Sequence, residues 1–77
     1  MKAYEVKKGE AEIKRGMVMM AIEGEESKVN RIDKELSKLF DGCDYEEEGD
    51  KEGEIVVFFM VDRSEKKYFM DLYKKLK

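Results

Sequence analysis

Seven consecutive apolar residues, from Ile55 to Val61, constrain the fold of this chain more than any other stretch. The segment lies between Glu54 and Asp62 and is rich in β-branched and aromatic residues, so its length and composition predict a β-strand rather than a helix. Side chains alternate between the two faces of a strand, and both faces of this one are apolar. Such a strand needs cover on both sides.

A second apolar run, Met17–Ile22, ends a longer extended segment that we predict over Glu10–Glu23. Apolar and charged residues alternate in the first half of this segment, whereas the second half is apolar throughout, which is typical of a strand buried on both faces. Gly16 lies between the two halves and predicts a bulge or bend. A short strand at Lys2–Lys7 and a turn at Lys8-Gly9 are predicted before it.

Two further segments have the apolar spacing of amphipathic helices. The first follows Gly24, with Ser27 as the predicted N-cap and Gly42 as the predicted C′ residue. The second runs from a predicted cap at Ser64 almost to Lys77. The apolar stripe of the first helix comprises Val29, Ile32, Leu36, Leu39 and Phe40. That of the second comprises Tyr68, Phe69, Leu72, Tyr73 and Leu76.

Between the two helices, Cys43–Glu48 predicts a short strand and Gly49–Gly53 a flexible turn that leads into Ile55–Val61 as a hairpin. The order is therefore strand–strand–helix twice within one domain, residues 1–77. The most economical packing is an α+β two-layer sandwich with ββαββα order. In it, a four-stranded, mainly antiparallel sheet carries both helices on one face.

Two helices on one face leave the opposite face of the sheet without cover. We expect about three apolar side chains from each of the two apolar strands to meet water there, more than a monomer usually exposes. A chain of 77 residues also has a small core, worth ~3–5 kcal/mol, and its single cysteine cannot form a disulfide within the chain. We therefore expect the chain to gain stability by associating with a second copy of itself or with another protein.

The sequence therefore predicts a non-enzymatic protein-interaction or adaptor module that self-associates as a homodimer, or binds another protein, through this sheet face. The predicted association surface comprises Met17, Met19, Val56, Phe58 and Met60. In the alternative arrangement, the N-terminal strand or the acidic hairpin folds over this face and covers it.

The charge distribution adds two alternative functions. Residues 41–54 hold eight acids against one base, a net charge of −7, and residues 63–77 hold six bases against two acids, a net charge of +4. The basic end predicts a small nucleic-acid-binding protein, although the stacking candidates Tyr68 and Tyr73 are also expected in the core. The acidic end predicts an inhibitor or nucleic-acid mimic of a mobile element. The basic candidates are Arg63, Lys66, Lys67, Lys74 and Lys75. The acidic candidates are Asp44, Glu46, Glu48 and Asp50.

Enzymatic, metal and cofactor functions are not expected. The chain has no histidine, so it lacks the usual general base, and Cys43 follows a glycine at a predicted helix end and is expected to be a small core residue. The acids from Asp44 onward imitate the start of a calcium loop, but its twelfth position is Ile55 instead of a bidentate glutamate. A cytoplasmic protein without a membrane segment, and with the Lys/Glu-rich composition of thermophile proteins, is the expectation.

Overall fold

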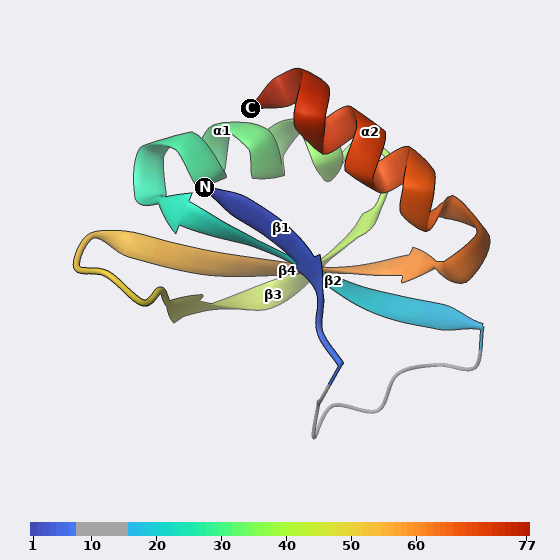
Figure 1. The fold of residues 1–77 in the computed structure, drawn as a ribbon, viewed down its shortest axis with the longest axis horizontal. Coiled ribbons are helices and arrows are strands. Elements are labelled where there is room, and N and C mark those ends of the chain that lie inside the picture. Colours follow the sequence, from blue (N-terminus) through green and yellow to red (C-terminus); the bar gives the residue numbers. More distant parts are fainter. Residues whose placement is uncertain (8–15) are drawn as a thin grey trace.

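The computed structural model of the chain describes residues 1–7 and 16–77, and it has the predicted α+β architecture (Figure 1). The element order is ββαββα, with a short 3₁₀ turn before the last helix. The strands form one antiparallel sheet in the order β1-β2-β4-β3, and both helices cover the same face of it (Figure 1). The elements are β1 (Lys2–Glu5), β2 (Met17–Glu25), α1 (Glu26–Leu36), β3 (Asp41–Glu48), β4 (Glu54–Asp62) and α2 (Lys66–Leu76).

The two apolar strands lie side by side in the centre of the sheet. They pair antiparallel along nine residues each, from Met17 opposite Asp62 to Glu25 opposite Glu54. Their side chains alternate as predicted, because Val18, Met20 and Ile22 from β2 and the odd-numbered residues 55–61 of β4 belong to the core under the helices.

The core on the helix side is closed by three phenylalanines. Phe59 of β4 and Phe69 of α2 are both fully buried, with ring centroids 5.5 Å apart. Phe40, from the loop after α1, packs edge-on against Phe69 at 5.2 Å. Such tilted aromatic pairs stabilise a fold beyond the effect of apolar burial alone. The three rings therefore hold α2 and the loop between α1 and β3 against the sheet.

The expectation that the other face of the sheet meets water is wrong. Ala21 is fully buried there, and Met19, Val56 and Phe58 are only 5–6% exposed. Val6, which follows β1, and Cys43, in the opposite edge strand β3, both pack against this second cluster. Among the described residues, both edges of the same sheet therefore contribute to this cover, as in the alternative arrangement.

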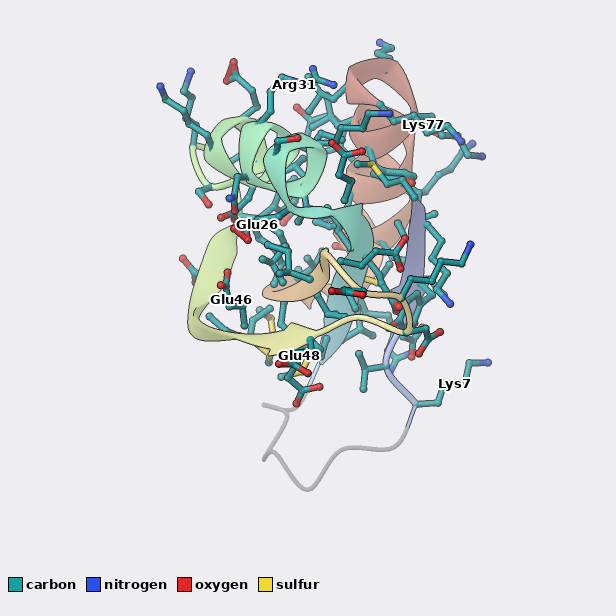
Figure 2. The ribbon with its side chains drawn as sticks, turned by 90° about the vertical axis from the view of Figure 1, so that its left-hand side faces the viewer. Lys7, Glu26, Arg31, Glu46, Glu48 and Lys77 are labelled. Carbon is teal, nitrogen blue, oxygen red and sulfur yellow. The ribbon has the colours of Figure 1, made fainter. Side chains whose placement is uncertain are left out.

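The curvature of the edge strands explains this cover. The register of β3 against β4 shifts between Gly42 and Glu46, and the ribbon of β3 turns sharply there and runs beneath the sheet (Figure 2). Irregular pairing of this kind bends a strand and increases its twist. On the other edge, the Val6 N–H donates to the Met19 carbonyl at 2.8 Å, which keeps the chain against β2 beyond the end of β1.

The boundaries of α1 differ from the prediction at both ends. The strand β2 continues through Gly24 because pairing with β4 extends it, so Glu25, not Ser27, is the N-cap residue. The helix ends at Leu36, whose carbonyl accepts from the Phe40 N–H at 2.9 Å. The tight turn that follows buries Phe40 and leaves Leu39 59% exposed, outside the apolar stripe. Gly42, the predicted C′ residue, lies in β3.

The start of α2 also differs. Asp62 caps the short 3₁₀ helix Arg63–Glu65 that precedes α2, since its carboxylate accepts from the Ser64 N–H at 3.0 Å and from the Ser64 Oγ at 2.7 Å. These hydrogen bonds lower the pKa of the Asp62 carboxyl. The N-cap residue of α2 is Glu65, not Ser64. Phe69 and Tyr73 form the buried stripe, whereas Tyr68, one residue before it, is 49% exposed.

Gly16 directly precedes β2 in a left-handed conformation, with φ +82°, and its carbonyl accepts from the Arg63 N–H at 2.9 Å. It therefore bends the chain directly before β2, which agrees with the predicted bulge or bend. The earlier part of the predicted Glu10–Glu23 strand and the predicted turn at Lys8-Gly9 lie outside the described residues.

The burial of Phe58 gives an expected outcome that separates the two arrangements of this face. Because an unpaired carboxylate in this cluster costs several kcal/mol, comparable with the whole stability of so small a domain, we expect Phe58→Glu to prevent folding. Circular dichroism and light scattering measure folding and mass. Met60→Glu, at a half-buried position on the same face, is the matched control and should lose less stability. A folded Phe58→Glu variant of lower mass than the wild type would instead support self-association.

Candidate functional site

The hairpin of β3, β4 and their connecting turn is strongly acidic, because residues 41–54 hold eight of the 19 acids of the chain. Its acids are exposed on one edge of the sheet, and Figure 2 shows Glu46 and Glu48 far from Arg31 and Lys77, which lie in the helix layer. The side chain of Asp44, one of the predicted acidic candidates, lies outside the described part of the chain. The exposed acids of β3 and the turn are Asp41, Glu46, Glu47, Glu48, Asp50 and Glu52.

The turn of this hairpin is hydrogen-bonded both within itself and to α1. Within it, the Gly49 N–H donates to the Glu54 carbonyl at 2.8 Å and the Glu54 N–H donates to the Lys51 carbonyl at 3.1 Å. The Gly53 carbonyl accepts from the Glu26 N–H at 3.2 Å, which ties the turn to the first residue of α1. At Gly49 a Cβ atom would lie 2.7 Å from the Glu54 Cβ, so this approach requires glycine.

A buried carboxylate, Glu23 of β2, fixes the turn to the opposite edge of the sheet. Glu23 is 5% exposed and accepts from the Tyr4 hydroxyl and from the Asp50 N–H, both at 3.0 Å. The Lys2 ammonium lies 3.8 Å from Glu23 and 3.4 Å from Asp50. Hydrogen bonds to an ionised group are stronger than neutral ones, so this network joins β1, β2 and the hairpin turn.

Sequence reasoning did not single out Glu23, although one signal was present. Because side chains alternate between the two faces of a strand, Glu23 lies on the same face as Met19 and Ala21. A charged side chain is uncommon on such an apolar face. A buried charge is tolerated only with partners, so this position predicts a polar network on that face. The partners come from β1 and the hairpin turn, and only the fold identifies them.

The same network changes the acidity of Tyr4. Burial, and then the hydrogen bond to Glu23 and the surrounding carboxylates, raise the pKa of the Tyr4 hydroxyl to about 12. The neutral hydroxyl is therefore the form that the folded state prefers, and it remains a donor at neutral pH.

A hollow of about 490 Å³ lies against the turn. Carboxylates dominate its lining, and a single base, Lys51, accompanies them. Within the described residues, no group of three or more acidic, cysteine or histidine side chains is arranged to hold a metal ion. The acids that line the hollow are Glu26, Glu48, Asp50, Glu52 and Glu54.

Three of the five residues of the predicted association surface are buried, and the other two are half-buried. Met19, Val56 and Phe58 belong to the second buried cluster, and only Met17 and Met60 at its margin are half-buried. The structure thus brings these residues together on one face but leaves little of them accessible.

The predicted basic residues differ in exposure and in their partners. Arg63, Lys67, Lys74 and Lys75 are exposed, whereas Lys66 is half-buried and forms an ion pair with Glu5 at 2.8 Å. The hydrogen bond from Lys66 lowers the pKa of the Glu5 carboxyl. This pair joins α2 to β1, so Lys66 has a structural partner of its own.

Comparison of the chain with models of protein families, with curated proteins and with solved structures finds no match. Neither α1 nor α2, the helices of the described residues, has the length and apolar character that crossing a bilayer requires.

The Tyr4–Glu23 hydrogen bond gives a pH-dependent expectation. Because the folded-state pKa of Tyr4, about 12, exceeds its ordinary value of 10.0, its stabilising contribution is complete below pH 10 and is lost as pH rises through 12. We expect Tyr4→Phe to lower the free energy of unfolding by about 1 kcal/mol at pH 7, and this deficit to vanish between about pH 10 and 12.

Urea unfolding followed by circular dichroism measures this difference. Tyr68→Phe, which removes an exposed hydroxyl from the helix layer, is the control and should follow the wild type throughout. A Tyr4→Phe deficit that stays constant up to pH 12 would contradict the assignment of this hydrogen bond.

Proposed function

We propose that the chain is a non-enzymatic protein-interaction module that binds a basic surface of a partner protein through its acidic hairpin. The observation that carries this proposal is the fixed geometry of the turn that presents the acids. Four hydrogen bonds hold that turn, two of them to Glu23 and Glu26 outside the hairpin. A surface that is already ordered loses little further conformational entropy when it binds.

The magnitude of the charge favours this surface over the others. The segment 41–54 carries −7, nearly twice the +4 of residues 63–77, and the chain as a whole is acidic at −3. Among the exposed acids of the described hairpin, only Asp50 has an ion-pair partner in the chain, Lys2 at 3.4 Å. The remaining carboxylates repel one another, and a cationic partner surface would relieve that repulsion.

Self-association through the second sheet face remains a prediction with a weaker physical basis. The apolar side chains that were to drive it, Met19, Val56 and Phe58, are already buried within one chain. Apolar surface contributes to association only in proportion to the area newly removed from water, so this face offers a small driving force.

A second candidate function, nucleic-acid binding by the helix layer, is favoured by one specific observation. Tyr68 was expected in the core, but it is 49% exposed and follows Lys67 on α2. An exposed aromatic ring on a helix rich in lysine is a feature that single-stranded nucleic acids can bind. Binding to a single-stranded oligonucleotide that falls steeply with salt would support this candidate.

Two variants of equal charge change test the acidic hairpin. Glu48→Gln with Glu52→Gln removes two hairpin carboxylates, and Glu65→Gln with Asp71→Asn removes two acids from the opposite side of the molecule. Each immobilised protein is used to capture partners from a lysate of the cells that encode the chain. The association rate of the purified partner is then measured at low and moderate salt.

We expect the wild type and the Glu65/Asp71 variant to capture the same basic protein. We expect the Glu48/Glu52 variant to associate with that protein about tenfold more slowly at low salt, because charges at the edge of an interface act chiefly on the association rate. Equal binding by all three proteins, or a partner without a basic surface, would refute the proposal.

A further inference from the structure

A hollow of about 420 Å³ lies between the first turns of α1 and the end of α2. Three of the four residues that line it are cations, Lys28 and Arg31 from α1 and Lys77 directly after α2, and the fourth is Met1. Figure 2 shows Arg31 and Lys77 in the helix layer, on the opposite side of the molecule from Glu46 and Glu48. This hollow is therefore separate from the acidic hairpin.

None of the three cations of the hollow forms an ion pair with a side chain in the described part of the chain. No acid lines it, and the ion pairs of the described residues use Lys2, Lys38 and Lys66 as their cations. Glu35, which follows Arg31 by one helical turn, is held by Lys38 at 2.7 Å. Like charges that converge on a hollow repel one another, and a bound anion relieves that repulsion.

A helical spacing positions two of the cations, and a contact with an aromatic ring positions the third. Lys28 and Arg31 are three residues apart on α1, so their side chains leave the helix on neighbouring positions of one side. The Lys77 ammonium lies 5.7 Å from the centroid of the Tyr73 ring, within the range of a cation–π interaction. Tyr73 is only 3% exposed, which makes it a fixed support for Lys77.

We propose that this hollow binds a phosphate group. A guanidinium fork donates two parallel hydrogen bonds to phosphate oxygens, and two ammonium groups supply the remaining charge for a dianion. The volume of about 420 Å³ exceeds that of a phosphate alone and leaves room for the rest of a larger phosphorylated compound. A free phosphorylated metabolite and a nucleic-acid backbone share this chemistry. The proposal does not depend on the function of the acidic hairpin.

Inorganic pyrophosphate is the first probe, added to the full chain up to about 10 mM while amide chemical shifts are followed by NMR. We expect saturable shifts at the amides around Lys28, Arg31 and Lys77. The variant Lys28→Ala with Arg31→Ala should bind pyrophosphate at least about tenfold more weakly, because each residue removes a charge-assisted hydrogen bond.

The variant Lys34→Ala with Lys67→Ala is the matched control, since it removes two exposed cations of the helix layer that do not line the hollow. We expect it to weaken binding by less than about threefold, through screened long-range charge alone. Because Lys28 and Arg31 are exposed, both variants should keep the wild-type circular dichroism spectrum. Equal weakening by the two variants, or shifts spread over all basic surfaces, or no shifts, would overturn the proposal.

A single-stranded hexanucleotide is the second probe and identifies the source of the phosphate. If it binds more tightly than pyrophosphate and its shifts extend from the hollow to Lys67 and Tyr68, the natural ligand is a nucleic-acid backbone. If its shifts stay at the hollow without a gain in affinity, the ligand is a free phosphorylated compound. Hexanucleotide shifts that avoid the hollow would exclude a nucleic-acid backbone and leave the free phosphorylated compound as its ligand.

Discussion

The full-length pairing of β2 with β4 is the constraint on which the rest of the structure depends. Both strands carry apolar side chains on both faces, so pairing them creates a central ribbon that must be covered above and below. The helices α1 and α2 cover one side. The other side is covered by the edges of the same sheet, because β3 bends beneath it and the chain after β1 stays against β2.

This arrangement also separates the charges. The helix layer holds its cations on the side away from the sheet, and the strongly acidic strand β3 lies at the far edge of the sheet order. Glu23 connects the two edges, because it stands on a central strand and accepts hydrogen bonds from Tyr4 on one side and from the Asp50 N–H on the other. A single buried carboxylate thus positions the acidic turn relative to the core. The acidic turn proposed for protein binding is therefore hydrogen-bonded to a central strand of the sheet.

The strands, the helices, their order and the alternation of faces could be predicted from the sequence, because long apolar runs and helical spacing are local signals. The positions at which the helices begin could not be predicted in this way. Strand pairing extends β2 to Glu25, beyond the predicted start of α1, and the Asp62 carboxylate caps the 3₁₀ helix before α2 in place of the predicted cap at Ser64. The cover of the second face was also beyond local reasoning, since it depends on the register shift in β3.

The candidate sites divide in the same way. The acidic hairpin is visible as a charge run in the sequence, whereas its fixed turn depends on contacts with Glu23 and Glu26, which are distant along the chain. The hollow with Lys28, Arg31 and Lys77 joins the two helices, and no local pattern brings those residues together. Tyr68 was assigned to the core because it fits an apolar stripe, and only the orientation of α2 places it outside.

The position of the two central strands has a consequence for how the chain acquires its structure. Each half of the chain contributes one strand–strand–helix unit, but β2 of the first half finds its principal neighbour in β4 of the second. The first half alone would leave one whole edge of β2 unpaired and its apolar faces open to water. We therefore expect the nascent chain to fold only after the ribosome has released β4, which ends at Asp62, because β2 has no partner on that edge before then.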